Sequence, residues 1–145
     1  MPPTAQLLLL STGGFFLTGL LCGCWKHSHI CCGADNAGPA YVEVPYRAGF
    51  MYAFAMLVLE RFVIASQLPD SVELAAVVVQ VAFFAFPIFT YVVHGVLQDT
   101  DNQFKPPHLL GRLVLPPAVV TASMLAIAAA DIGGFWVLLW GATLA

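Results

Sequence analysis

Charged residues are scarce in this chain of 145 residues, at only 9% of the sequence. Soluble domains carry about 25%, so these side chains are too few to cover a surface that faces water. Hydrophobic residues make up 60%. A net charge of −3, with no run of basic residues, excludes a typical nucleic-acid-binding protein. The composition therefore predicts an integral membrane protein in contact with a lipid bilayer.

Long uncharged stretches predict an all-α fold, an integral membrane four-helix bundle that forms a single transmembrane domain over residues 1–145. No charged residue occurs in residues 1–25 or in residues 74–98. A helix that crosses the hydrocarbon core needs about 20 apolar residues. We expect spans near residues 5–25, 46–67, 72–97 and 113–130. The apolar tail, residues 131–145, either extends the fourth helix or lies along the membrane interface.

The few basic residues predict the orientation in the membrane. Lys26 is the first basic residue of the chain, so the basic start of a cleaved signal peptide is missing. Lys26 and Arg47 border the loop over residues 26–45, and Lys105 and Arg112 lie in the loop over residues 98–112. The positive-inside rule therefore predicts that both loops are cytoplasmic.

Polar residues recur on one face of each of two expected helices. In the third, they follow steps of three and four residues, over Gln80, Phe84, Pro87, Tyr91, His94 and Gln98. In the second, a face of small and polar residues comprises Tyr46, Gly49, Ala53, Met56, Glu60 and Gln67. In lipid such faces turn toward the bundle interior or a cavity. They either join helices to one another or line a site.

Four polar residues lie deep within the expected spans or at their edges: Glu60, Arg61, Gln80 and Asp131. A charge at the middle of a membrane helix costs about 2.5–3.5 kcal/mol on insertion scales, so we expect a partner or a function. An ion pair between Arg61 and Asp131 is one expectation, with Glu60 near Gln80. The alternative is that Arg61 reaches the interface and Asp131 lies beyond the hydrocarbon.

A second polar group is expected at the cytoplasmic end. It contains Tyr46, Arg47, Tyr91, His94, Asp99, Asp101, Asn102 and Gln103. An imidazole, phenols, a guanidinium and carboxylates beside an apolar pocket can perform acid–base chemistry on a lipophilic molecule. The same residue types also form ordinary interfacial belts, and the sequence leaves both interpretations open.

All four cysteines of the chain lie in one short stretch that also contains two histidines. Its members are Cys22, Cys24, His27, His29, Cys31 and Cys32. The spacing is not that of a structural zinc site, so no metal site is predicted. Cysteines next to a membrane span are also acylation sites, and a cluster without a special role is the third alternative.

Several landmarks resemble those of the styrene oxide isomerase type of small four-helix membrane enzyme. They are Gly13-Gly14-Phe15-Phe16-Leu17, Gly19-Leu20, Gly23, Trp25, Tyr46-Arg47-Ala48-Gly49 and Asn102-Gln103-Phe104. The resemblance implies a haem-containing trimer that isomerises an epoxide to a carbonyl compound. The haem-ligating histidine of those enzymes corresponds to Tyr46 here, and a nearby asparagine to Tyr52. A tyrosine late in their third helix is similar to Tyr91.

The segment Glu43-Val44-Pro45-Tyr46-Arg47-Ala48 also resembles the membrane-associated eicosanoid and glutathione metabolism superfamily. That resemblance implies a glutathione-dependent membrane transferase. The asparagine and glutamate that follow in that family are missing among residues 50–55. Both resemblances imply a small homo-oligomer, a trimer, that binds a lipophilic substrate between helices.

We therefore predict an integral membrane enzyme that acts on a lipophilic small molecule, an isomerase that opens an epoxide or performs an acid–base rearrangement. The predicted catalytic residues are Tyr46, Arg47, Tyr91, His94, Asp99 and Asn102. The alternatives are a non-catalytic accessory subunit of a larger membrane complex, the glutathione-dependent transferase and a transporter. The identity of a cofactor stays open, with haem as the option that the first resemblance implies.

Overall fold

The protein is a bundle of four long helices with a short β-hairpin. The structure, a computed structural model, describes residues 1–32, 39–100 and 102–144. In chain order it contains α1 (Pro3–Cys32), α2 (Ala40–Ala65), α3 (Asp70–Leu97), β1 (His108–Leu110), β2 (Leu113–Leu115) and α4 (Pro117–Thr143). All four helices are long and apolar enough to cross a membrane. The predicted all-α four-helix bundle is confirmed, and the protein is a multi-pass integral membrane protein.

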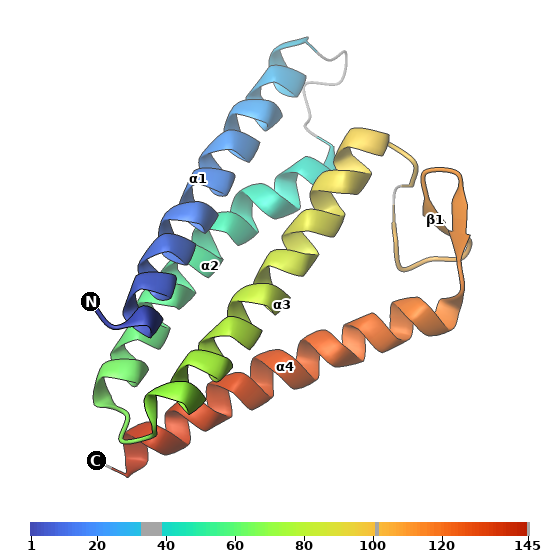
Figure 1. Ribbon diagram of the computed structural model, residues 1–145. Coiled ribbons are helices and arrows are strands. Elements are labelled where there is room, and N and C mark those ends of the chain that lie inside the picture. The colour runs from blue at the N-terminus through green and yellow to red at the C-terminus, as the bar shows by residue number, and fades with distance from the viewer. Residues whose placement is uncertain (33–38, 101, 145) are drawn as a thin grey trace.

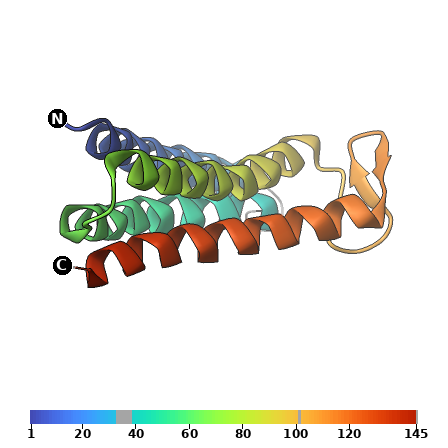
Figure 2. The ribbon, with the colours of Figure 1, turned by 60° about the horizontal axis from the view of Figure 1, so that its bottom comes forward.

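α1, α2 and α3 lie side by side, whereas α4 meets them near its C-terminal end and diverges toward Pro117 (Figure 1). The two chain termini and the short α2–α3 link lie at one end of the bundle, and the hairpin lies at the other (Figures 1 and 2). We call these the terminal end and the hairpin end. The backbone N–H of Gln67 donates to the carbonyl of Gly141 at 3.1 Å, which fixes α4 to the α2–α3 link.

Glycines allow a close contact between α1 and α2. A Cβ atom at Gly49 would lie 2.7 Å from the backbone nitrogen of Gly19. Glycine at this crossing lets the two backbones touch, as is common between membrane helices. The buried apolar core continues from there through Leu8, Phe15, Ala53, Met56, Leu59, Ala76, Val77, Ile88 and Leu138.

The helix bounds differ from those expected. α1 continues past Trp25 to Cys32, because no proline or glycine interrupts residues 24–32. α2 begins at Ala40 rather than at Tyr46, with Pro39 before its first turn and Pro45 inside the helix. Residues 26–32 and 40–45 of the expected loop are thus helical.

α4 was expected over residues 113–130, but it begins at Pro117 and continues through the apolar tail to Thr143. Leu113–Leu115 instead forms β2, antiparallel to β1, with His108 opposite Leu115. Gly111 has φ +60° in the turn, a conformation that glycine adopts without strain. The short strands have no long pattern of alternating polarity, so they could not be predicted from the sequence.

Candidate functional site

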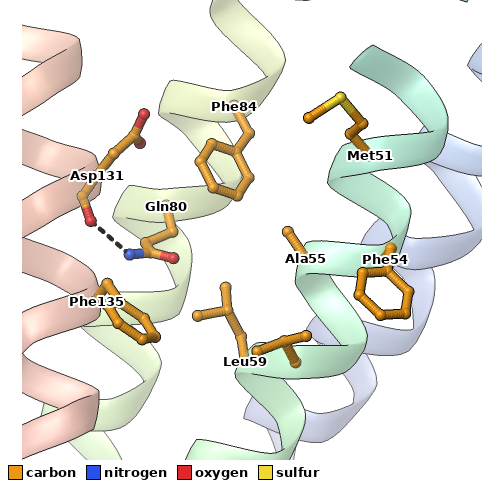
Figure 3. Close-up of a pocket in the computed structure, with 9 residues that line it drawn as sticks. Met51, Phe54, Ala55, Leu59, Gln80, Phe84, Asp131 and Phe135 are labelled. Atoms are coloured by element: carbon orange, nitrogen blue, oxygen red, sulfur yellow. Dashed lines mark hydrogen bonds between the residues drawn. The ribbon is translucent and has the colours of Figure 1, made fainter. Parts of the chain in front are cut away.

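A groove of about 290 Å³ lies between α2, α3 and α4 (Figure 3). Its lining is apolar apart from two residues, and comprises Met51, Phe54, Ala55, Val58, Leu59, Gln80, Phe84, Asp131 and Phe135. Gln80 and Asp131 were predicted as intramembrane polar residues, and the fold brings both to this groove. We call it the Asp131 groove. An apolar hollow with a few polar groups is the usual form of a small-molecule site.

The Asp131 carboxyl group lacks a partner within the part of the chain that the structure describes. Its Oδ1 atom is buried and makes no hydrogen bond. The backbone carbonyl of Asp131, in contrast, accepts from Gln80 Nε2 at 2.9 Å (Figure 3). A buried carboxyl oxygen without a partner is unfavourable, and carboxyl groups at intramembrane positions mark functional sites.

The expected ion pair between Arg61 and Asp131 does not form. Arg61 is exposed on α2, and the ion pairs among the described residues involve neither residue. An exposed arginine three to four residues from the end of its helix can extend toward the interface, which removes the need for a buried partner. Glu60 is half-buried and does not line the Asp131 groove.

Close contact between α3 and α4 holds Gln80 in place. A Cβ atom at Gly134 would lie 2.8 Å from Gln80 Cγ and 3.1 Å from Nε2. Gln80 is 2% exposed, and Figure 3 shows its amide between α4 and α2, with the oxygen turned toward α2. Glycine at position 134 therefore lets the amide reach the Asp131 carbonyl.

Aromatic contacts shape the rest of the groove, and of the residues in them Phe62 and Phe135 were not singled out from the sequence. Phe84 stacks on Tyr52, with ring centroids 4.5 Å apart and planes 8° from parallel. Phe135 of α4 contacts Phe62 edge to face, at 5.1 Å between centroids. Offset and edge contacts of this kind stabilise the packing by about 0.5–1.5 kcal/mol each. The spacing from Gln80 had placed Phe84 on this face of α3, whereas no pattern in the sequence indicated Phe135.

A second polar cluster lies at the hairpin end, around His94. His94 Nδ1 is 2.7 Å from Asp99 Oδ1, and the two side chains are 5% and 6% exposed. The carboxylate accepts, so Nδ1 carries the proton in this hydrogen bond. Asp99 Oδ2 accepts from the backbone N–H of Gly111. The pair therefore joins the end of α3 to the hairpin.

The pKa of Asp99 lies below its ordinary value. Burial alone raises the pKa, but the hydrogen bonds from the Gly111 N–H and from His94 outweigh it. Both bonds stabilise the ionised carboxylate. Asp99 is thus a fixed acceptor near neutral pH.

Tyr41, which the sequence did not indicate, joins this cluster. Its ring lies 5.3 Å from the His94 ring and 5.5 Å from the Tyr91 ring, between centroids. Its hydroxyl accepts from the backbone N–H of Gln103. Tyr41 was missed because residues before Pro45 were assigned to a loop; the early start of α2 is what carries it beside α3.

Tyr46 and Arg47, expected beside His94, instead belong to the α1–α2 contact. Tyr46 packs on α1, where its ring would be 3.0 Å from a Cβ atom at Gly23. Arg47 pairs with Glu43 at 2.5 Å, and Glu43 also pairs with Lys26 at 2.6 Å. The predicted catalytic set is thus divided between two places.

Asn102 makes only local hydrogen bonds. Its Oδ1 accepts from the backbone N–H of Phe104 at 2.9 Å, and its own N–H donates to Thr100 Oγ1 at 3.1 Å. It shapes the loop before the hairpin. Asp101, which was also expected in this group, lies outside the described residues.

The cysteine and histidine cluster lies along the last turns of α1. Cys22 is buried, and Cys24, Cys31 and Cys32 are exposed thiols. Cys31 Sγ lies 3.4 Å from His27 Nε2, one helical turn away. Among the described residues, no three His, Cys, Asp or Glu side chains are grouped closely enough to hold a metal ion.

Tyr46 does not fit the role of a haem ligand. The Lys26 ammonium lies over its ring at 5.3 Å, and Phe50 packs edge to face at 5.5 Å between centroids. These contacts hold the Tyr46 ring between α1 and α2. The nearby carboxylate of Glu43 already pairs with both Lys26 and Arg47. We derive no chemical step through haem.

Comparison with known proteins gives no relative to guide assignment of the site. No protein-family model matches the chain, and neither the curated proteins nor the solved structures contain a significant match.

Proposed function

We propose that the protein is an intramembrane enzyme that isomerises a lipophilic small molecule bound in the Asp131 groove. One observation carries the proposal: a buried carboxyl oxygen without a partner forms part of the wall of an apolar groove between three membrane helices. A substrate dissolved in the bilayer reaches such a groove without crossing water. Its polar atom would supply the hydrogen-bond partner that Asp131 lacks.

An isomerisation suits this site because it needs no second substrate. In its protonated form, Asp131 donates a proton to the oxygen of an epoxide and one C–O bond breaks. A hydride then shifts between the two carbons, and the resulting O–H proton returns to the carboxylate. The product is a carbonyl compound with the same atoms, and the enzyme regains its starting state. Gln80 acts as a positioning residue, because it holds the Asp131 backbone.

The direct test is turnover of a panel of lipophilic epoxides by the purified protein in lipid nanodiscs, followed by chromatography of the isomeric carbonyl products. Asp131→Asn should lower turnover by at least about 100-fold, the usual contribution of a general acid. Asp70→Asn alters an exposed carboxylate at the start of α3 and serves as the matched control. Full activity of Asp131→Asn would overturn the proposal.

A second candidate, an accessory subunit of a membrane complex, is favoured by the exposure of α4. The buried residues of this helix are Gly134, Leu138 and Gly141, so its N-terminal half offers an apolar face to lipid or to another subunit. A homo-oligomer would use the same face. Native mass spectrometry of the protein from its own membrane separates these cases: copies of one chain support the enzyme, and fixed heterologous partners support the subunit.

We also propose that the hairpin end faces the cytoplasm. This end contains four basic residues, Lys26, Arg47, Lys105 and Arg112. At the opposite end, the first turn of α3 contains the acidic residues Asp70 and Glu73. The positive-inside rule favours this orientation. Cys24, Cys31 and Cys32 are exposed toward this end, so a membrane-impermeant maleimide should label inverted vesicles but not intact cells. Labelling of intact cells would show that the hairpin end faces the outside instead.

A further inference from the structure

A second groove, of about 570 Å³, runs along α1 and α2 at the hairpin end. It is lined by Leu20, Gly23, Cys24, Lys26, His27, Ile30, Tyr46 and Phe50. None of these residues lines the Asp131 groove, so the two are separate. We call it the Lys26 groove.

The Lys26 groove changes from apolar to charged along its length. Leu20 and Phe50 lie at the apolar end, and Lys26 and His27 lie toward the end of α1. From Lys26 to Leu20 the helix rises about 9 Å, the length of about seven carbons of a fatty acyl chain. A hollow of this kind fits an amphiphile with its polar group near Lys26.

Among the described residues, the ion-pair cluster beside the groove has an excess of one positive charge. Glu43 pairs with Lys26 through one carboxylate oxygen and with Arg47 through the other, at 2.6 and 2.5 Å. Two cations thus share one anion. The Arg47 side chain is 71% exposed, so its guanidinium can turn to a second acceptor. A phosphodiester with a single negative charge would balance the site.

Contacts of Tyr46 position the ammonium group for such an anion. The ring lies against Gly23, where a Cβ atom would come within 3.0 Å of it, so a larger residue would displace the ring. Lys26 Nζ lies 5.3 Å from the ring centroid, within the range of a cation–π interaction. Gly23 and the Tyr46 ring thus form one wall of the groove, and the Lys26 ammonium is held beside that wall.

We infer that the Lys26 groove binds an anionic diacyl phospholipid. Its phosphate lies between Lys26 and Arg47, and one acyl chain follows α1 past Leu20 and Phe50. Lysine and arginine beside a membrane span attract anionic headgroups, and here an apolar channel continues from the cations into the bilayer. This inference is independent of the proposed enzyme, because it uses neither Asp131 nor Gln80.

The test is lipid retention by the full chain, measured by native mass spectrometry after purification in an equal mixture of phosphatidylglycerol and phosphatidylcholine. The wild type should retain phosphatidylglycerol at least about five-fold over phosphatidylcholine, as expected from the attraction of even one basic residue. The double variant Lys26→Gln/Arg47→Gln should lose this preference. Lys105→Gln/Arg112→Gln removes the same charge from the loop and turn beside the hairpin and should keep it.

Two further variants separate the parts of the inference. Glu43→Gln removes the competing carboxylate and should raise the retention of phosphatidylglycerol. Leu20→Trp fills the apolar end without changing charge and should lower it, with the exposed Leu17→Trp as its control. Leu20→Trp also decides the matter if the double charge variant fails to fold.

Equal retention of the two lipids by the wild type would overturn the inference, as would an unchanged preference in the double charge variant. Thermal stabilisation by inorganic phosphate alone, as large as that by phosphatidylglycerol, would also contradict it, because the acyl groove would then have no role.

Discussion

The two buried polar clusters of the bundle differ in how completely their groups are hydrogen-bonded. At the hairpin end, both carboxylate oxygens of Asp99 accept hydrogen bonds, from His94 and from the Gly111 N–H. In the Asp131 groove, a buried carboxylate oxygen has no partner among the described residues. A fully bonded cluster stabilises the fold. An unbonded buried group is unfavourable for the fold by itself, which is why we propose that Asp131 binds a ligand.

Substitution of Asp99 should have the largest effect on stability, and substitution of Asp131 should have almost none. Asp99→Asn weakens a buried network that joins α3 to the hairpin and should lower the free energy of unfolding by about 2–3 kcal/mol. Asp131→Asn removes a carboxyl group without a partner, and should change stability by less than about 0.5 kcal/mol or increase it. Thermal and denaturant unfolding in one detergent measure both. Equal losses would remove the contrast between the clusters.

Two neighbouring glycines of α4 offer a smaller test. A Cβ atom at Gly134 would collide with Gln80, whereas nothing lies within 4 Å of one at Gly133. Gly134→Ala should therefore cost about 1–2 kcal/mol through local overpacking, and it should lower turnover because Gln80 shifts.

Gly133→Ala is the matched control. Alanine favours the helix over glycine by up to about 1 kcal/mol, so this variant should be neutral or slightly stabilising. If both alanines had the same effect on unfolding, close α3–α4 contact would not hold the groove.

Acid should weaken the hairpin-end cluster in a predictable direction. The pKa of Asp99 is lowered in the folded protein, so its contribution to stability is present above the ordinary aspartate pKa of about 3.9. It is lost as the pH falls below that value and through the lower folded pKa. Unfolding curves between neutral pH and strong acid should show this loss in the wild type, and a smaller loss in Asp99→Asn. Parallel curves would mean that other groups govern acid unfolding.

The smallest expected effect concerns Asn102, whose bonds are all local. Asn102→Ala removes one acceptor for the Phe104 N–H and should cost about 0.5–1 kcal/mol, well below the loss in Asp99→Asn. Thermal unfolding of the two variants side by side measures the difference. A loss in Asn102→Ala as large as that in Asp99→Asn would show that the loop, rather than the buried pair, holds the hairpin.

The helices could be predicted from the sequence because apolar length alone determines a membrane span. Their ends could not. The second span was expected to begin at Tyr46, after Pro45, yet the helix tolerates the hydrogen bond that this proline loses and begins at Ala40. Because the helix begins six residues earlier than expected, Tyr41 lies beside His94, where Tyr46 was expected. A single boundary therefore changed the membership of the predicted site.

Deep polar residues were more informative than the interfacial ones. Gln80 and Asp131 could be singled out because polar groups are costly in lipid, and the fold joins them. The pairing of Asp131 with Arg61 could not be tested by charge alone, since a long side chain near a helix end has the alternative of reaching the interface. The aromatic lining depended on tertiary packing, which hydropathy does not encode.

Chemical modification of Asp131 tests the central claim most directly. Dicyclohexylcarbodiimide is a lipophilic reagent that adds to protonated carboxyl groups exposed to the apolar phase and forms a stable N-acylurea. Treatment of the protein in nanodiscs, followed by peptide mass spectrometry, should show the adduct at Asp131 and none at Asp99. A lipophilic epoxide that the protein isomerises should slow the labelling. An unmodified Asp131 under conditions that label other carboxyl groups would contradict the account, since its carboxyl would then be closed to molecules from the bilayer.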